Sequence, residues 1–344
     1  MVDTPGTGDH GLQDTAGQLA DYALGHLFSA ALRTAARCRI ADRLAAGPRT
    51  AGQLAELTDT HAGHLRRVLR YLATRDIFRE DGTGAFHLTP LADALRTDVP
   101  NSLHAAVLML TDPAFQQTSA GLEETVRQAG PSFERLFGKP FFDHLADDPA
   151  LRDLFDSGMA SLSGPFDAVV AGTYPFPDKG IVVDVGGGRG GLLRTVLRGR
   201  PGLTGVLFDQ PAAVTTHMLA GDDAVRGRWR AESGDFFTQV PEGGDIYVLK
   251  HVLHDWPDDA CLRILRNCRA AMAPDARLLI VDCVLPAGNA PHLGKTLDVA
   301  MAAIVDGQER TEDEFSALLT VAGLRLTRIL PTEMFASIVE AEAA

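Results

Sequence analysis

An apolar segment that runs into a glycine-rich turn constrains the fold of this chain more than any other feature. Residues 181–191 read IVVDVGGGRGG, with glycine at five of the last six positions. A turn without Cβ atoms lets backbone N–H groups close on a ligand. Taken alone, the turn fits two classes of ligand, because its glycines satisfy two different spacing patterns.

The two patterns use different glycines of the turn. Gly186, Gly188 and Gly191 satisfy the GxGxxG spacing of dinucleotide-binding turns. Asp184 followed by Gly186, Gly188 and Gly190 satisfies the acidic-xGxGxG spacing of turns that bind S-adenosylmethionine. Residues beyond the turn are needed to decide between these two cofactors.

The C-terminal half of the chain alternates apolar strand candidates with helical patterns. This alternation predicts a mainly parallel sheet with helices on both faces, a doubly wound, Rossmann-like α/β fold. Ligands of such sheets bind beyond the carboxyl ends of the strands, near the point where the strand order reverses. We expect strands at residues 181–185, 204–209, 245–250, 277–282, 324–330 and 335–339, with helices such as 258–272 and 311–322 between them.

Polar residues follow four successive strands of the predicted sheet. The glycine turn follows the first strand, Asp209 ends the second, Asp235 follows the next short strand, and residues 250–255 follow the fourth. Because the carboxyl ends of parallel strands share one edge of a sheet, we expect these residues to meet there. Polar residues at four successive strand ends are much less likely to arise by chance than a single glycine turn.

The charges at this edge favour S-adenosylmethionine. Asp209 lies 21 residues beyond Gly188, a distance at which an acidic residue binds ribose hydroxyls. Asp235 is suited to accept a hydrogen bond from an exocyclic amino group, and Phe236 to stack on a purine. The carboxylates at 184, 209 and 235 would repel a pyrophosphate, whereas a sulfonium without phosphate tolerates them. A nicotinamide dinucleotide, and with it an oxidoreductase, is the alternative.

His254, at the mouth of this predicted cofactor site, is the candidate general base. Asp282 ends the fifth strand and Glu309 precedes a helix, so either carboxylate can hold one imidazole nitrogen and orient the other. Alternatively, Glu309 belongs to a helix cap and Asp282 to a strand-end turn. No metal is predicted, because Trp256-Pro257 interrupts the only cluster of suitable ligands, which comprises His251, His254, Asp255, Asp258 and Asp259.

Three helices and a hairpin predict a winged-helix-like arrangement near the N-terminus. Residues 15–46 and 61–74 have helical periodicity, and 77–88 predict a small hairpin. Thr50 and Gln53 predict a capping box at the start of the helix between them.

These patterns divide the chain into three parts. We expect a disordered lead at residues 1–14, a helical, winged-helix-like domain at 15–165 and the sheet domain at 166–344. Asp148-Pro149 and Gly164-Pro165 are the predicted helix breaks near the end of the helical domain.

Composition limits the partners of the chain. The formal net charge of −13 argues against nucleic acid and anionic membranes. Arg66, Arg67 and Arg70 would lie on the recognition helix of a DNA-binding regulator, but no Asn or Gln accompanies them, so we expect a solvated or carboxylate-paired face.

No apolar run approaches the roughly 18–20 residues that cross a bilayer. Four cysteines without a CxxC pair suit a reducing compartment, so we expect a cytoplasmic protein.

The motifs together resemble a known family. DVGGGRGG, FDQP, SGDFF, LKHVLHDWPDD and QERTEDEF occur in this order and resemble those of S-adenosylmethionine-dependent O-methyltransferases of the plant caffeate and flavonoid type, in the bacterial branch that tailors aromatic natural products. The resemblance covers nearly the whole chain. It implies a front domain that serves dimerisation and roofs the substrate pocket, hence a homodimer, and an aromatic small molecule as methyl acceptor.

The resemblance also implies roles for individual residues. His254 takes the position of the general base, Glu309 that of the glutamate that orients it, and Asp282 stands where plant members have glutamate. The residues implied to bind the cofactor are Gly186 and Gly188 at its methionine part, Asp209 at the ribose, Asp235 and Phe236 at the adenine, and Lys250. Residues assigned to the acceptor are Asp255 and the methionines that sandwich the ring, Met159 and Met301.

The implied reaction is an in-line displacement. A hydroxyl that gives its proton to His254 attacks the methyl group of S-adenosylmethionine, and S-adenosylhomocysteine leaves. Methylation of nitrogen or carbon, or non-methylating chemistry on the same scaffold, is the alternative within enzymes. The presence of His254 favours O-methylation.

Overall fold

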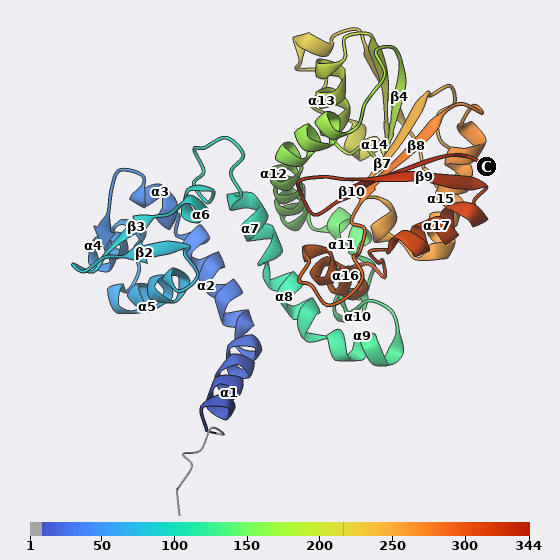
Figure 1. Ribbon diagram of the computed structural model, residues 1–344. Helices are drawn as coiled ribbons and strands as arrows, with labels where there is room; N and C mark the ends of the chain where they lie inside the picture. The colour runs from blue at the N-terminus through green and yellow to red at the C-terminus, as the bar shows by residue number, and fades with distance from the viewer. Residues whose placement is uncertain (1–8, 216) are drawn as a thin grey trace, which may run out of the picture. The chain divides into compact units, whose positions relative to one another are not determined.

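A seven-stranded sheet forms the centre of the C-terminal part of the computed structural model, which describes residues 9–215 and 217–344 (Figure 1). The strand order is β6-β5-β4-β7-β8-β10-β9, and β10 runs antiparallel to both of its neighbours while the other neighbouring pairs are parallel. The strands are β4 (Gly180–Val185), β5 (Leu203–Asp209), β6 (Trp229–Ser233), β7 (Ile246–Lys250), β8 (Arg277–Asp282), β9 (Leu324–Pro331) and β10 (Ser337–Ala343). The predicted doubly wound, mainly parallel sheet is confirmed.

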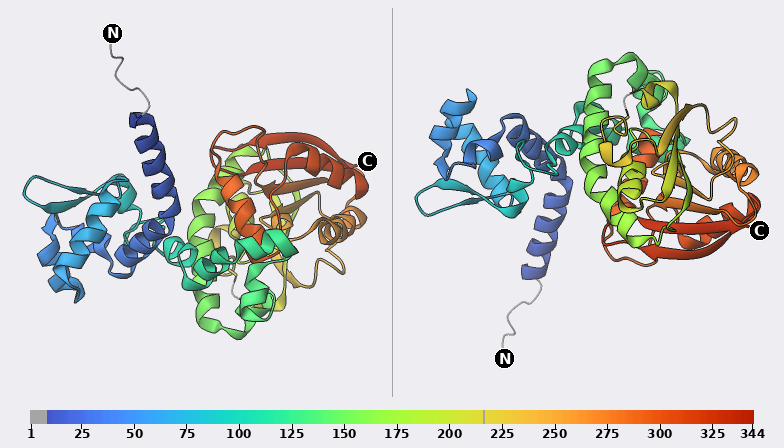
Figure 2. Two further views of the ribbon diagram at one scale, coloured as in Figure 1. Left: turned by 90° about the horizontal axis from the view of Figure 1, so that it is seen from below. Right: turned by 90° about the horizontal axis from the view of Figure 1, so that it is seen from above.

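The chain adds β5 and β6 on one side of β4 and then crosses to β7 on the other side. The strand order therefore reverses between β4 and β7, and a ligand is expected at their carboxyl ends. β9 and β10, drawn in red in Figure 2, close the opposite edge of the sheet from β6.

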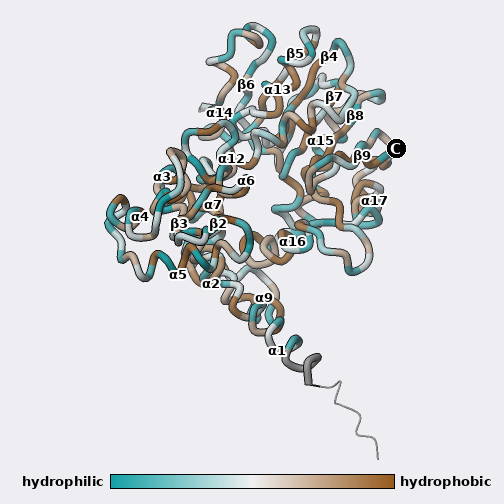
Figure 3. The backbone as a smooth tube through the Cα atoms, turned by 60° about the vertical axis from the view of Figure 1, so that its left-hand side comes forward, coloured by the Kyte–Doolittle hydropathy of each residue, from teal (hydrophilic) through white to brown (hydrophobic). Residues whose placement is uncertain are grey.

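Helices cover both faces of this sheet (Figure 1). Its central strands are accordingly runs of mostly hydrophobic residues, coloured brown in Figure 3. Val183 packs with Ile264 of α15 (Asp258–Ala271) and Phe315 of α17 (Glu312–Val321) in one buried cluster. Val182, the residue before Val183, belongs to the other cluster, with Phe166 of α12 (Pro149–Thr173) and Leu193 of α13 (Gly191–Gly199). Adjacent residues of a strand point to opposite faces, which is why a continuous apolar run is required here.

The N-terminal unit has its own core. The helices α2 (Gly25–Arg37), α4 (Ala51–Thr58) and α5 (Ala62–Ala73) precede the hairpin of β2 (Phe78–Glu80) and β3 (Ala85–Leu88), as predicted. β1 (Arg49–Thr50) adds a third strand to that hairpin. The capping box of Thr50 and Gln53 is confirmed. Fully buried side chains of this core are Ile40, Leu54, Leu69, Leu72 and Phe86.

The remaining elements are mostly short helices. Those of the first 120 residues are α1 (Asp9–Ala23), α3 (Ile40–Leu44), α6 (Pro90–Asp93), α7 (His104–Leu110) and α8 (Pro113–Ala120). Those that follow are α9 (Leu122–Gln128), α10 (Ser132–Phe137), α11 (Phe141–Asp147), α12 (Pro149–Thr173), α14 (Pro211–Val214), η1 (Asp223–Val225), η2 (Leu253–Asp255) and α16 (Leu293–Ile304). None of the helices in the described ranges is both long and apolar enough to span a membrane.

The chain falls into two compact units, each built from two segments of the sequence. Residues 1–116 and 150–162 form one unit, and 117–149 and 163–344 form the other. The segment 117–149 belongs with the sheet because it packs on α16; for example, the Ser132 hydroxyl donates to the carbonyl oxygen of Ala303 over 3.2 Å.

Two local predictions are wrong. Gly164-Pro165 does not end a helix, because α12 continues through it to Thr173; the packing of Phe166 and Val170 on the sheet outweighs the backbone hydrogen bond that proline cannot make. The lead predicted as disordered at 1–14 is helical from Asp9 onward, since these residues contain no proline and a formed helix propagates readily. Residues 1–8 lie outside the described residues.

The arginines of α5 pair with a carboxylate. Arg66 and Arg70 both contact Glu80 of β2, with N···O distances of 3.1 and 2.8 Å. For these two side chains the carboxylate-paired alternative, rather than a free cationic face, describes the structure.

Candidate active site

The glycine turn between β4 and α13 has a backbone that side chains would disrupt. Gly186, Gly188 and Gly190 have φ values of 68°, 55° and 75°, in the left-handed region that favours glycine. A Cβ on Gly186 would lie 2.9 Å from Cγ2 of Val252, whereas the space over Gly188 is open to beyond 4 Å. The turn therefore offers a stretch of backbone without a side chain over Gly188 at the start of a helix, which a ligand can approach closely.

Asp184 lies directly beneath this turn. A Cβ on Gly187 would lie 2.6 Å from the Asp184 carboxyl carbon, so glycine is needed for the turn to pack on that carboxyl group. Neither carboxylate oxygen has a hydrogen-bond partner among the described residues. Burial raises the pKa of Asp184 to about 7, although the charge of Lys250 opposes the rise. A cationic ligand close by would favour the ionised form of Asp184.

Asp209, at the end of β5, contacts the glycine turn. Its carboxylate oxygens accept the backbone N–H groups of Gly188 over 2.7 Å and of Gln210 over 2.6 Å. The turn is anchored a second time by the N–H of Gly186, which donates to the carbonyl oxygen of Phe208 over 2.8 Å. The structure thus brings the carboxylate predicted for the ribose into direct contact with the glycine turn.

Asp235 and Phe236 lie beyond the end of β6. The exposed carboxylate of Asp235 accepts the N–H of Phe237 over 2.9 Å and the hydroxyl of Thr238 over 3.1 Å. The ring of Phe236 is 3.5 Å from the position that a Cβ on Gly186 would take. An aromatic ring therefore borders the turn, as a purine site requires.

Lys250, at the end of β7, forms a buried ion pair with Asp167 of α12. Asp167 also lies against the first residue of α13, leaving no room for a side chain at Gly191. Burial raises the pKa of Asp167, while the charge of Lys250 lowers it. Sequence reasoning missed Asp167, because it lies on a helix 83 residues before its partner and belongs to no recognisable motif.

His254 and Glu309 meet although they are 55 residues apart. Nδ1 of His254, in η2, lies 3.0 Å from Oε1 of Glu309, and Glu309 is only 3% exposed. The backbone N–H of Glu309 donates to Asp298 of α16 over 2.9 Å, which fixes the loop that carries the carboxylate. The other imidazole nitrogen, Nε2, lies 3.6 Å from Oδ1 of Asp255.

Asp282 lies beside a second histidine. Its Oδ1 is 3.6 Å from Nδ1 of His251, and both of its buried oxygens lack a hydrogen-bond partner among the described residues. The rings of His251 and His254 stack, with centroids 5.4 Å apart. Asp282 therefore reaches the site, yet His251 is the imidazole it faces most directly. The sequence marks His251 only as a potential metal ligand. Its backbone is in the left-handed region, with φ of 53°, so the chain turns at His251, three residues before His254.

The charges around His254 are strongly coupled. Burial alone would lower the pKa of its imidazole, but the carboxylates of Asp255, Asp282 and Glu309 raise that pKa to about 10. Burial raises the pKa of Asp255 to about 6 and also raises that of Glu309, against the attraction of His254.

The potential metal-ligand atoms of His251, His254 and Asp282 lie within 4.8 Å of one another.

The two methionines predicted to sandwich an acceptor ring belong to different units. Met159 is in the unit formed by 1–116 and 150–162, and Met301 is on α16 in the other. Both side chains are half-buried. Their joint role stays a prediction.

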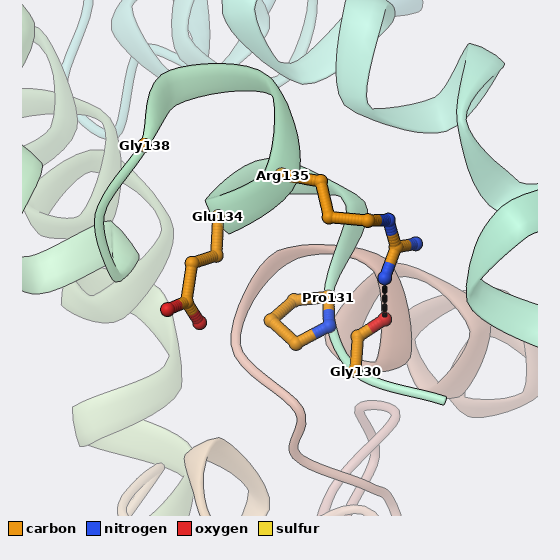
Figure 4. A pocket seen from close by; sticks show the side chains of 5 residues that line it. All are labelled: Gly130, Pro131, Glu134, Arg135 and Gly138. Carbon is orange, nitrogen blue, oxygen red and sulfur yellow. Dashed lines mark hydrogen bonds between the residues drawn. The ribbon is translucent and has the colours of Figure 1, made fainter. Parts of the chain in front are cut away.

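A surface hollow on the 117–149 segment contains none of the predicted site residues (Figure 4). Within it, Arg135 donates to the carbonyl oxygen of Gly130 over 2.9 Å. The residues that line it are Gly130, Pro131, Glu134, Arg135 and Gly138. The residues that meet at the strand ends, rather than this hollow, carry the chemistry described above.

Comparison with known proteins identifies the family. Residues 120–325 match the O-methyltransferase domain, and residues 20–98 match the O-methyltransferase dimerisation domain. The chain belongs to the O-methyltransferase family. It is an S-adenosylmethionine-dependent O-methyltransferase, and the prediction of S-adenosylmethionine as cofactor is confirmed.

Relatives resemble this methyltransferase over almost their whole length. The phenazine O-methyltransferase PhzM of Lysobacter antibioticus is 38% identical over 94% of this chain and 95% of its own. The 8-amino-8-demethylriboflavin N,N-dimethyltransferase of Streptomyces davaonensis is 36% identical over 94% of each. Among solved structures, the S-adenosylhomocysteine-bound form of CalO1, a methyltransferase in calicheamicin biosynthesis, has 42% identity and a TM-score of 0.90, covering 96% of this chain and 99% of its own.

Proposed function

We propose that this methyltransferase transfers a methyl group to a phenolic hydroxyl of an aromatic natural product, with His254 as the general base. The observation that carries the proposal is the 3.0 Å contact of His254 Nδ1 with the buried Glu309. Glu309 orients the ring by this nitrogen, which leaves Nε2 to accept a proton. The acceptor class is inferred from relatives such as the phenazine enzyme.

The raised pKa of His254 suits proton transfer from a phenol. An ordinary histidine, with a pKa near 6.5, would take the proton of a phenol of pKa near 10 at a cost of roughly 5 kcal/mol. With a pKa of about 10, His254 is nearly matched to such a hydroxyl, so the proton-transfer step itself is close to balanced. The same shift leaves nearly all of the imidazole protonated at neutral pH, so the cost moves to forming the neutral base, and activity should rise with pH as that base accumulates.

The strand-end residues would hold the cofactor, which supplies an electrophilic methyl group on a sulfonium. Gly186 and Gly188 would contact its methionine part, Asp209 the ribose, and Asp235 with Phe236 the adenine. Lys250 and its partner Asp167 lie next to the start of α13, within the same edge of the sheet. Asp255 and Asp282 would stabilise the imidazolium that forms when His254 takes a proton, and Met301 would contact the acceptor.

Nitrogen methylation is the second candidate, since a relative of 36% identity is an N,N-dimethyltransferase. An amine acceptor needs no base matched to a phenol, so the His254–Glu309 pair favours oxygen. A panel of hydroxylated and amino-substituted phenazines and naphthalenes, incubated with S-adenosylmethionine, tests this. Mass and NMR analysis should place the new methyl group on oxygen; methylation of the amines alone would contradict the proposal.

We also propose that the enzyme is a homodimer. The dimerisation-domain match, residues 20–98, includes α2 and the last four residues of α1. Large apolar side chains are exposed within it, at Tyr22, Leu24 and Leu27, and directly before it, at Leu19. A second copy of the chain is the natural cover for such a face. Light scattering should give twice the chain mass. The cytoplasmic location and the absence of a nucleic-acid partner stay predictions.

A further inference from the structure

Arg310 is the residue that follows Glu309, and it is the largest side chain that the described fold buries completely, at 1% exposure. Its guanidinium donates to the carbonyl oxygens of Leu253 and Trp256, each over 3.0 Å. These two carbonyls flank His254 in the chain. Arg310 therefore holds the backbone on both sides of the proposed base.

The same guanidinium is itself fixed at further points. It donates to Oδ1 of Asp258 over 2.7 Å from Nη2 and 3.1 Å from Nε, and it contacts the sulfur of Cys261 over 3.4 Å. A planar guanidinium offers its donors in a rigid fork, so contacts in several directions allow it one orientation only. The side chain is a rigid link rather than a flexible one.

The loop 307–310 packs on the His254 segment at other positions as well. A Cβ on Gly307 would overlap the carbonyl oxygen of His254, so the two backbones are in direct contact. The side-chain amide of Gln308 donates to Asp258 over 2.8 Å. The N–H of Leu285 donates to the carbonyl oxygen of Arg310 over 2.9 Å, which ties this loop to the chain after β8.

We propose that Arg310 is a positioning residue for the methyl transfer, acting through the geometry of the His254–Glu309 pair. Arg310 is joined covalently to Glu309 and by hydrogen bonds to the backbone around His254, so it fixes the distance between carboxylate and imidazole. Displacements of about 1 Å at such a pair lower rates by large factors. This inference rests on the proposed function of His254 as base.

Arg228 provides a matched control, since its guanidinium also donates to main-chain carbonyls. The acceptors are those of Leu197, Arg200, Leu203 and Ala224, at 2.7 to 3.2 Å. None of them is a residue of the candidate site. Arg228 is half-buried rather than fully buried, but replacing it also removes hydrogen bonds to main-chain carbonyls without touching the His254–Glu309 pair.

The test compares Arg310→Met, Arg310→Lys and Arg228→Met in the full-length enzyme, with kcat measured across pH, KM for S-adenosylmethionine and thermal unfolding. We expect Arg310→Met to lower kcat at least about 10-fold, with KM for S-adenosylmethionine unchanged. The rising limb of its pH profile should move to lower pH, because Glu309 supports the charged imidazole less. Arg310→Lys should recover part of the loss, and Arg228→Met should lose stability while keeping kcat and the limb.

The outcomes separate this inference from the proposed function. If His254→Ala is inactive and Arg310→Met keeps the wild-type kcat and pH limb, the positioning role is wrong and the base remains. If His254→Ala turns over like the wild type, the base assignment fails, and the positioning role fails with it. Should Arg310→Met not fold, Arg310→Lys takes its place: a lowered kcat with a shifted limb supports the role, and wild-type values overturn it.

Discussion

The contact of the glycine turn with Asp209 and the contact of His254 with Glu309 arise in different ways. The glycine turn and Asp209 are 21 residues apart and meet because two adjacent parallel strands end side by side. His254 and Glu309 are 55 residues apart and meet only because a loop after α16 packs on the segment after β7. The first arrangement follows from strand topology, whereas the second depends on particular long-range contacts. We therefore expect changes at the two places to affect different quantities, cofactor affinity at one and turnover at the other.

The largest effect should come from His254→Ala. Removing the proposed base should lower kcat by about two or more orders of magnitude, because the imidazole that Glu309 orients to take the proton of the hydroxyl is gone. The affinity for S-adenosylhomocysteine, measured by calorimetry, should stay at the wild-type value. A loss of affinity as large as the loss of turnover would show that the two regions are not separate.

Gly186→Ala should do the reverse. Its backbone has φ of 68°, and a Cβ would lie 2.9 Å from Val252, so the turn must shift, with backbone strain of about 1–2 kcal/mol. We expect the dissociation constant for S-adenosylhomocysteine to rise about 10-fold, with kcat at saturating cofactor little changed.

Gly199→Ala, at the end of α13, is the matched control for that substitution. No heavy atom lies within 4 Å of a Cβ built on Gly199, so the affinity should not change. An equal loss of affinity in both variants would remove the argument from the geometry of the turn.

Glu309→Gln should change the pH dependence of turnover. The pKa of His254 is raised to about 10 by its carboxylate neighbours against the effect of burial. Taking away one negative charge lets that pKa fall, so the rising limb of kcat should move to lower pH. The maximal kcat should fall roughly 10-fold, because the amide holds the imidazole less firmly. A limb that stays in place would mean that Asp255 and Asp282 set the pKa of His254 without Glu309.

The smallest effect is expected from Asp184→Asn, and it concerns stability. The ordinary carboxyl pKa of 3.8 is raised to about 7 in the fold, so the free energy of unfolding should fall as pH rises between these values. The asparagine variant lacks this dependence. Thermal unfolding without cofactor, measured from pH 4 to pH 7, should show a flatter profile for the variant, by a few degrees at the upper end. Parallel profiles would contradict the raised pKa.

The sequence predicted the parts of the molecule that local patterns control. Strand 277–282 matches β8 residue for residue, because apolar runs with charged ends delimit a buried strand. The last strand was expected at 335–339 but occupies Ser337–Ala343, since its antiparallel pairing with β8 determines its length. Helix α12 ran through the expected Gly-Pro break for a related reason, namely tertiary packing.

The residues of the candidate site show the same distinction between local patterns and tertiary contacts. The glycines, Asp209, Asp235 and Phe236 are placed at one edge by strand topology, which motifs reveal. Asp167 and Arg310 contact partners that are far away in the sequence. The position of His251 depends on its own left-handed backbone conformation. No periodicity marks such residues, so physical reasoning from one sequence could not find them.

The carboxyl group beneath the glycine turn has a consequence for the life of the enzyme. Asp184 has no hydrogen-bond partner among the described residues, which makes the ligand-free protein less stable than its packing alone would allow. Any ligand that binds only the folded state raises the free energy of unfolding by an amount that grows with the logarithm of the ligand concentration. A bound cofactor therefore adds to the stability of the fold as well as taking part in the reaction.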